Sequence, residues 1–311
     1  MATTILRPST HAEWLEARKR GLGSSEIGTI CGLNPYETPY QLWRRKMGID
    51  SPKEETFAMK AGHYLEDAVA QFWQDATGRT IIKSSAGDWL IRNDKKEFLQ
   101  ASPDRTYWLS DKRNNEKGIL ECKTTQRTIA DDDIPKAWFC QVQYQLGVAE
   151  MEQGSLAWLS AGRDFGYKDL AFVPDFYDWL CDEASRFWVD NVLGCKEPEV
   201  VNVADVLLKY AEHTADKTIE CDDELFLEYS KLKQIREEIK RLEEHKENIE
   251  NAIKMRMQDA EKISYSGMTL ATWKRGKDSQ KFNAKRFCES NPQLAEEFTE
   301  VVPGSRRFIL K

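Results

Sequence analysis

The sequence predicts a mixed α/β core, in which helices flank a mixed central sheet, followed by a C-terminal helical, coiled-coil-like appendage with a small β part. Residues 1–200 alternate helical and strand patterns with short turns, as α/β domains do. From about residue 222 the composition changes to Lys and Glu around apolar residues in heptad-like spacing. A chain of 311 residues has room for both parts. We therefore expect a core domain at 1–200, a connector at 201–221, a long amphipathic helix at 222–262 and a small basic α+β module at 263–311.

The composition is that of an ordinary soluble protein and argues against several classes of protein. With 41% hydrophobic and 31% charged residues, the chain has ample material for a core. It holds no run of about 18 apolar residues that would span a membrane, and its N-terminal residues lack the apolar stretch of a secretory signal. The seven cysteines are scattered without a C-x-x-C pair, which indicates reduced thiols, a cytoplasmic location and no zinc site. Because the chain has only four histidines, carboxylates are the expected metal ligands.

Residues 14–48 combine a basic cluster, a Gly-Leu-Gly-Ser-Ser segment and a short helix. Ser24 or Ser25 is expected to cap this helix, which leaves backbone N–H groups and the positive end of the helix dipole facing outward. Arg18 precedes Ser25 by seven residues and is expected to fold back over the same place. The pattern is compatible with a bound anion, although a capping Ser near an Arg is frequent in proteins of every kind.

A helix is expected at residues 61–78, AGHYLEDAVAQFWQDATG. Its apolar face follows i, i+3 and i+4 spacing and comprises Leu65, Ala68, Val69, Phe72, Trp73 and Ala76. Glu66 lies on the flank of this face, near the expected start of the helix. One interpretation is that its carboxylate only offsets the helix dipole. The other is that the carboxylate faces a metal site, as a ligand bound directly or through water.

Two short strands around a Ser-Pro-Asp turn are expected at residues 98–108, and a third strand at 118–123. Antiparallel neighbours lie about 5 Å apart, so pairing of the second and third strands would bring Asp104 near Glu121. On the third strand Glu121 and Lys123 share one face. Taken alone, Asp104 is explained by turn chemistry. The Glu-x-Lys pair alone is explained by an ion pair on a half-solvated face.

Taken together, Asp104, Glu121 and Lys123 predict two oxygen ligands and one cation at the same point. Mg²⁺ prefers one or two carboxylates supplemented by water and substrate phosphate oxygens. A lysine beside such a site orients or deprotonates the attacking water and stabilises developing charge. This arrangement resembles the P-D…(D/E)-x-K signature of metal-dependent nucleases.

An apolar helix expected at residues 137–148, AWFCQVQYQLGV, carries polar amides. Gln141 and Gln145 are one turn apart on one face, whereas Gln143 points elsewhere. Amides in such a helix need hydrogen-bond partners. Backbone groups would serve, and so would phosphates or metal-bound water.

The helix expected at 222–262 has an apolar seam of the coiled-coil kind. Its spacings of seven, three and four residues are interrupted by Lys246, where an apolar residue is expected. The seam consists of Leu225, Leu232, Ile235, Ile239, Leu242, Ile249 and Ile253.

The module at 263–311 opens with a hairpin pattern, ISYSGMTLATW, whose turn is Ser266-Gly267. It closes with an expected strand, RRFIL, at 306–310. Nine Lys and Arg against five Asp and Glu make this module locally basic in a chain whose net charge is −7. An acidic net charge does not suggest a nucleic-acid binder, but it is compatible with a local basic groove.

Five motifs in this order resemble those of the phage-type alkaline exonucleases typified by bacteriophage lambda exonuclease, the YqaJ viral recombinase family. The resemblance runs over residues 14–195 and implies the PD-(D/E)XK restriction-endonuclease-like fold. The motifs are R-x6-S at Arg18 and Ser25, G-x3-E at Gly62 and Glu66, S-P-D at 102–104, E-C-K at 121–123 and Q-V-Q-Y at 141–144.

The resemblance implies a role for each matching residue. It makes Asp104 and Glu121 metal ligands, joined by the backbone carbonyl of Cys122. Glu66 completes the metal site, directly or through water, and Lys123 acts on the water. The implied catalytic residues are Glu66, Asp104, Glu121 and Lys123. The residues implied to hold the 5′-phosphate of a DNA end are Arg18, Ser25, Ser102 and Gln141, with Gln143 and Tyr144 in support.

By this resemblance the chain is expected to be a Mg²⁺-dependent 5′-to-3′ exonuclease, with Mn²⁺ as a substitute. It would degrade one strand of linear double-stranded DNA and leave 3′ single-stranded DNA for phage-type recombination by a single-strand annealing protein. The family's ring-shaped trimer implies a homo-oligomer, and the setting implied is a phage or prophage protein in the cytoplasm of a bacterial host.

Two alternatives stay open. One is an endonuclease or nickase that uses the same metal site. The other is a non-catalytic module that binds a DNA end or a partner. The region after about residue 200 is absent from the shortest family members. It is expected to brace the oligomer, bind DNA, dock the annealing protein, or only add stability, and packing of its apolar seam against the core domain is a further alternative.

Overall fold

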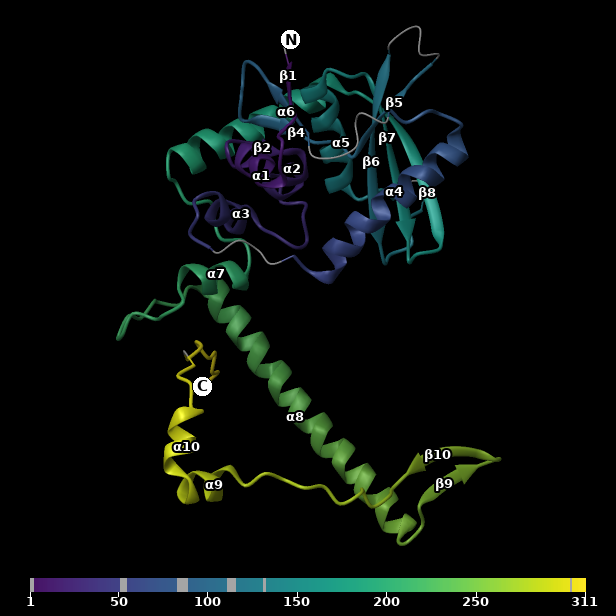
Figure 1. Cartoon of the computed structure of the whole chain (residues 1–311). Coiled ribbons are helices and arrows are strands. Elements are labelled where there is room, and N and C mark those ends of the chain that lie inside the picture. The colour runs from purple at the N-terminus through teal and green to yellow at the C-terminus, as the bar shows by residue number, and fades with distance from the viewer. Residues whose placement is uncertain (1–2, 51–54, 83–88, 111–115, 131–132, 303) are drawn as a thin grey trace. The chain divides into compact units, whose positions relative to one another are not determined.

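The computed structural model describes residues 3–50, 55–82, 89–110, 116–130, 133–302 and 304–311 (Figure 1). It divides the chain into two compact units, Met1–Lys209 and Tyr210–Lys311. The first unit mixes helices and strands, so the predicted α/β class is confirmed. Among the described residues, no helix combines the length and apolar character needed to cross a bilayer.

The first unit contains two sheets and the helices that pack on them. Its elements are β1 (Thr3–Leu6), α1 (His11–Lys19), β2 (Leu22–Gly23), α2 (Ser24–Ile30), α3 (Pro39–Lys46), α4 (Phe57–Thr77), β3 (Leu90–Asn93), β4 (Leu99–Ala101), β5 (Arg105–Trp108), β6 (Lys117–Thr125), α5 (Lys136–Ala149), β7 (Gln153–Ser160), β8 (Asp164–Ala171), α6 (Pro174–Arg186), its π-helical continuation η3 (Phe187–Leu193) and α7 (Val203–Lys209).

The strands form two four-stranded sheets, in the orders β1-β3-β4-β2 and β5-β6-β7-β8. In the second sheet β6 is antiparallel to β5 and parallel to β7, while β7 is antiparallel to β8. The sheet is therefore mixed, as predicted. The Ser-Pro-Asp segment at 102–104 follows β4 in one sheet and precedes β5 in the other. It joins the two sheets, rather than turning between two strands of one hairpin.

The side chains of β6 alternate between two helical layers. Leu120 and Cys122 pack with the side chains of α4, and Ile119 packs with those of α5. Full burial of such an apolar side chain contributes about 1.5–3 kcal/mol. Because strand residues alternate, Glu121 and Lys123 are on the α5 side of the sheet. The fold thus sets two charged residues at the boundary between a sheet and a buried helix.

The apolar face predicted for α4 is wrong in part. Leu65 and Phe72 are exposed, and the residues that pack onto the sheet are Val69, Ala70 and Trp73. The helix begins at Phe57 and is longer than predicted at its N-terminal end. The periodicity predicted the helix correctly, but it predicted a buried face turned partly away from the real one. Leu and Phe had been assigned to the core on their hydrophobicity alone.

A helix lies within the segment expected to be a connector. In α7 the side chain of Asp205 is fully buried. It accepts hydrogen bonds from Thr38 Oγ1 at 2.8 Å and Gln41 Nε2 at 3.0 Å. These bonds fix α7 to the start of α3, so the first unit extends to Lys209.

The second unit consists of α8 (Asp223–Met257), β9 (Lys262–Tyr265), β10 (Met268–Thr272), α9 (Ala284–Ser290) and α10 (Pro292–Glu297). The predicted hairpin turn is confirmed, since Ser266 and Gly267 have φ values of +48° and +81°, as a type I′ turn requires. The strand predicted at 306–310 is wrong. A strand needs a neighbour for its backbone groups, and in the described residues β9 and β10 pair only with each other.

A buried acid holds α2 against α3. Glu26 is 5% exposed, and its carboxylate pairs with Arg45 Nη1 at 3.1 Å and Lys46 Nζ at 2.8 Å. Burial alone would raise the pKa of Glu26, but Lys46, Arg45 and Arg18 outweigh it and hold the pKa below its ordinary value.

We expect the Glu26 cluster to make stability depend on acid pH. A carboxyl whose pKa is lowered by folding contributes its stabilisation above its unfolded pKa and loses it as the pH falls through its folded pKa. Glu26→Gln should lower the free energy of unfolding by about 3–5 kcal/mol at neutral pH, because Lys46 loses its buried partner. Urea unfolding of both proteins across the acid range measures this. The two curves should converge as the pH falls. A difference independent of pH would contradict the assignment, and Glu97→Gln, at an exposed residue, is the control.

Candidate active site

A cavity of about 360 Å³ lies in the first unit, and its walls come from both sheets and four helices. It brings together every residue that the sequence analysis expected to act through its side chain on a metal, a water or a 5′-phosphate. These residues are Arg18, Ser25, Glu66, Ser102, Asp104, Glu121, Lys123 and Gln141. The expected ligand group of Cys122 belongs to the backbone between two of them.

The pairing of β5 with β6 sets the two acids side by side. Arg105 is opposite Leu120 in the antiparallel register, so Asp104 reaches the sheet next to Glu121. Its Oδ2 accepts a hydrogen bond of 2.6 Å from the backbone N–H of Cys122. The predicted approach of Asp104 to Glu121 thus follows from the register.

Glu121 is held by three side chains. Its Oε1 accepts hydrogen bonds from Lys123 Nζ at 2.6 Å and Gln141 Nε2 at 2.5 Å, and its Oε2 accepts one from Gln145 Nε2 at 2.7 Å. Lys123 also donates to Gln141 Oε1 at 2.9 Å. Because Glu121 is only 2% exposed, the interpretation of Glu-x-Lys as a half-solvated ion pair is wrong. The pair forms, but inside the cavity.

Glu66 approaches the same point from α4. It precedes Val69 and Ala70 by three and four residues, so it is on the buried face of the helix. Since α4 begins at Phe57, the interpretation of Glu66 as a first-turn acid that offsets the helix dipole is wrong. Its Oε1 accepts a hydrogen bond of 2.6 Å from Arg105 Nη1. Arg105, which directly follows Asp104, was not among the predicted site residues.

Burial and neighbouring carboxylates raise the pKa of two acids of the cavity, Asp104 and Glu66. Burial raises the pKa of Asp104 well above its ordinary value, and the charges of Glu121 and Glu66 add to this. Burial also raises the pKa of Glu66, against the opposing charge of Arg105. For Lys123 burial acts downward, but Glu121 and Asp104 prevail and raise its pKa, which keeps the ammonium charged. Three carboxylates thus line the cavity together with the cationic side chains of Lys123, Arg105 and Arg18.

This donor set fits a hard divalent cation. Mg²⁺ takes one or two carboxylates and completes its octahedron with water and substrate phosphate oxygens. Asp104, Glu121 and the carbonyl of Cys122 would supply oxygen ligands, and Glu66, which lines the same cavity, would complete the site directly or through water. In the ranges that the structure describes, no three His, Cys, Asp or Glu side chains already form a complete metal cage. A bound cation would therefore depend on water or substrate for its remaining ligands.

The cavity is also lined by Arg18 and Ser25. Arg18 Nη2 donates to Ser25 Oγ at 3.2 Å, and the guanidinium lies 4.7 Å from the ring centroid of Trp14. The predicted capping of α2 by Ser24 or Ser25 is wrong, because its N-cap is Gly23, with the Glu26 side chain accepting the Gly23 N–H.

Two of the residues expected at the phosphate are engaged by the protein. Ser102 donates from Oγ to the carbonyl of Trp89 at 2.5 Å, and Gln141 is bound to Glu121 and Lys123. Both line the cavity, so both can reach a ligand by exchanging partners.

Gln143 and Tyr144 are outside the cavity lining. Gln143 donates to the carbonyl of Ala171 at 2.8 Å and accepts from the N–H of Val173 at 2.9 Å, which ties the end of β8 to α5. Tyr144 donates its hydroxyl hydrogen to the carbonyl of Leu22 at 3.1 Å. Their support of the site is structural, through the packing of α5.

Gln145 was not selected as a site residue, although its spacing from Gln141 shows that both amides are on one face of α5. It donates to Glu121 and also to Ser24 Oγ, at 3.2 Å. Its Oε1 is buried without a hydrogen-bond partner among the described residues. The amide therefore both positions Glu121 and offers a spare acceptor.

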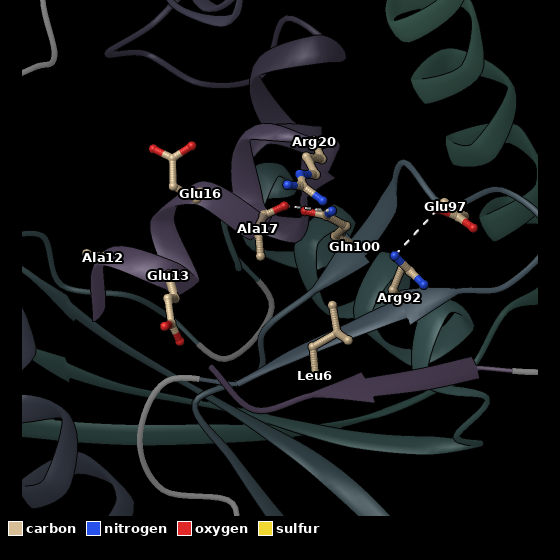
Figure 2. A pocket seen from close by; sticks show the side chains of 9 residues that line it. All are labelled: Leu6, Ala12, Glu13, Glu16, Ala17, Arg20, Arg92, Glu97 and Gln100. Atoms are coloured by element: carbon tan, nitrogen blue, oxygen red, sulfur yellow. Dashed lines mark hydrogen bonds and ion pairs between the residues drawn. The ribbon is translucent and has the colours of Figure 1, made fainter. Parts of the chain in front are cut away.

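A larger cavity, of about 510 Å³, has a different character (Figure 2). It is lined by residues of α1, β1, β3 and β4 and by the loops next to them. Its glutamates do not converge in Figure 2, and one of them, Glu97, pairs with Arg92 at 3.4 Å. The convergent acids distinguish the smaller cavity as the candidate active site.

Comparison with known proteins agrees with the family resemblance of the sequence. Residues 13–152 match the model of the YqaJ-like viral recombinase domain. The uncharacterized protein YqaJ of Bacillus subtilis (strain 168) is 31% identical over 310 residues, which cover 96% of this chain and 93% of that protein. The chain belongs to the YqaJ-like viral recombinase family. The matched range spans the whole cavity lining, and membership of this family supports a nuclease role.

Two solved structures are similar to this YqaJ-like chain at low sequence identity. One is an alkaline exonuclease from Laribacter hongkongensis in complex with dAMP, with 14% identity, a TM-score of 0.46 and coverage of 64% of this chain and 98% of that one. The other is a phage related exonuclease from Haemophilus somnus 129PT, with 11% identity, a TM-score of 0.42 and coverage of 57% and 96%.

Proposed function

We propose that this protein is a Mg²⁺-dependent exonuclease that degrades the 5′-ended strand of linear duplex DNA, with Mn²⁺ as a substitute. The 3′-ended strand left behind would serve recombination by strand annealing. The observation that carries the proposal is the convergence of Asp104, Glu121 and Lys123 in one cavity that Arg18 also lines. Acids, a lysine and an anion-binding group are the parts that phosphodiester hydrolysis at a phosphorylated end requires.

The residues of the cavity have separate proposed roles. Mg²⁺, when bound, supplies Lewis acidity toward the scissile phosphate. Asp104 and Glu121 provide the negative charge that holds a cation there. The charged ammonium of Lys123, 2.6 Å from Glu121, is placed to orient a water and to stabilise charge on the phosphate oxygens. Gln141 and Gln145 hold the Glu121 carboxylate in one orientation.

The decisive experiment uses a linear duplex with a 5′-phosphate and a separate label on each strand, with a covalently closed circle in parallel. Mg²⁺-dependent loss of the 5′-ended strand with an intact circle would support the proposal. If EDTA prevents degradation of this strand and added Mn²⁺ restores it, the proposed dependence on a divalent metal would be supported. Cutting of the circle would instead indicate an endonuclease that uses the same site. If neither DNA is cleaved with any metal, the alternative of a non-catalytic DNA-binding module would be favoured.

The end of the DNA is expected to matter. Arg18 and Ser25 would engage a terminal phosphate by charge-assisted hydrogen bonds. A duplex with 5′-hydroxyl ends should therefore be degraded at about one tenth of the rate of the 5′-phosphorylated duplex, or at a lower rate still. Initial rates on the two substrates measure the ratio. Arg18→Ala should bring the ratio close to one, whereas Arg20→Ala, on the larger cavity, should preserve it. Equal rates for the wild-type enzyme would remove Arg18 and Ser25 from end recognition.

A further inference from the structure

The long helix of the second unit carries an apolar seam that the described part of the chain leaves exposed. α8 has 35 residues, which at 1.5 Å per residue is about 52 Å. Its seam residues are 37–61% exposed in this structure. They are Leu225, Leu232, Ile235, Ile239, Leu242, Ile249 and Ile253. A stripe of this length with so much exposed apolar surface marks an interaction site.

The spacing identifies the kind of partner. The seam repeats every seven residues, in alternating steps of three and four, from Leu232 to Ile253. In heptad notation the a positions are Leu232, Ile239, Lys246 and Ile253, and the d positions are Ile235, Leu242 and Ile249. A strict heptad repeat fits another helix in a left-handed coiled coil, since each a and d side chain then enters a hole on the partner.

A parallel pairing of two copies is unfavourable. In register it would set Lys246 against the partner's Lys246 in the core. The flanking g and e positions would also meet with like charges, Lys231 with Arg236 and Glu238 with Glu243. Each such contact is repulsive.

An antiparallel pairing removes all of these conflicts. When Ile239 faces the partner's Leu242, the two helices overlap over nearly their whole length, because these residues are at the middle of α8. The flanking e positions then meet as Arg236 with the partner's Glu243. The two Lys246 side chains lie roughly 16 Å apart along the axis, at 1.5 Å per residue.

The remaining core layers of this register include one apolar layer and two that set an apolar residue against a charged one, since Ile253 faces the partner's Glu228 as Lys246 faces Ile235. Leu232 faces the partner's Ile249, and Glu238 meets the partner's His245. Lys246 faces the partner's Ile235, and within its own helix its Nζ lies 3.5 Å from Glu250. A single polar residue at an a position reduces stability but selects one register over the others.

We propose that α8 binds the α8 of a second copy of this chain as an antiparallel coiled coil centred on Ile239 and Leu242. The partner is thus a second copy of the protein, recognised by matched length, heptad spacing and complementary charge. This contact is made by the second unit, so it is separate from any assembly that the first unit forms. Each coiled coil joins two copies of the whole chain.

The test is a set of charge substitutions in the full-length chain, measured by sedimentation velocity over a wide concentration range. Arg236→Glu would face the partner's Glu243 in both symmetric pairs, and the dissociation constant should rise about tenfold. Adding Glu243→Arg should restore the wild-type value. Arg241→Glu carries the same change of charge on the outer face and should have little effect. None of these residues belongs to the apolar seam, so α8 should remain helical by circular dichroism.

The direction in which Arg236→Glu changes the dissociation constant distinguishes an antiparallel pair of helices from a parallel one. In a parallel pair Arg236→Glu would meet the partner's Lys231 and strengthen association, which would overturn the antiparallel register. Ile239→Asp removes a central core layer and should lower the assembly mass to that set by the first unit alone. If the wild type and Ile239→Asp have the same mass at every concentration, two copies do not meet through α8 and the proposal is wrong.

Discussion

Lys123→Ala is expected to slow cleavage of linear duplex DNA by about 10³-fold or more while DNA binding in the presence of Mg²⁺ changes little. The ammonium nitrogen lies 2.6 Å from Glu121 and 2.9 Å from Gln141. It is inside the cavity that the carboxylates of Asp104 and Glu66 also line. Its removal leaves both carboxylates of the expected metal pair in place. The group lost is the cation that would orient the water and stabilise charge developing on the phosphate.

Single-turnover cleavage of a labelled duplex measures the loss, and fluorescence anisotropy with Ca²⁺ in place of Mg²⁺ measures binding. Lys117→Ala is the matched control, because Lys117 is an exposed lysine at the other end of the same strand. It should cleave at the wild-type rate. If Lys123→Ala retains cleavage, Lys123 has a structural role as the buried ion-pair partner of Glu121.

The part of the site that the sequence predicted is the part that strand geometry determines. Alternation along β6 sets Glu121 and Lys123 on one face, and antiparallel pairing with β5 brings Asp104 beside them. These are rules of strand geometry, so three charged residues close to one another in the sequence were sufficient to predict this part of the site.

The parts that were missed depend on tertiary packing. Periodicity located α4 but rotated its buried face, because the spacing of Val69 and Trp73 is shared by the alternative face through Leu65 and Phe72. Only the packing of the helix on β6 selects one of them, and this choice places Glu66 on the buried side.

Arg105 and Gln145 were missed for a related reason. Each acts through a residue on a different element, Arg105 on Glu66 and Gln145 on Glu121. Their roles follow from contacts across the cavity, which a single sequence does not display. The capping of α2 was missed because Gly23, which offers no side chain, stands at the N-cap, and Glu26 satisfies its N–H.

Glu121→Gln is expected to abolish cleavage and also to remove the response of the folded protein to metal. The change keeps the shape of the side chain and deletes the charge of one of two carboxylates that would hold the cation. A ligand that binds only the folded state raises its stability, so Mg²⁺ should raise the melting temperature of the wild type. It should leave that of Glu121→Gln nearly unchanged. Cleavage should fall by about 10³-fold or more, since a cation site without this charge is rarely filled.

Thermal unfolding with increasing Mg²⁺ and with Ca²⁺ measures the response without reference to activity. Glu116→Gln is the matched control, because it removes an exposed acid just before the same strand and leaves the cavity intact. That variant should retain both the cleavage rate and the metal-dependent rise. If Glu121→Gln loses cleavage but keeps the rise, the cation binds without Glu121, and this carboxylate acts on catalysis by positioning Lys123. If it keeps both, Glu121 is not a metal ligand.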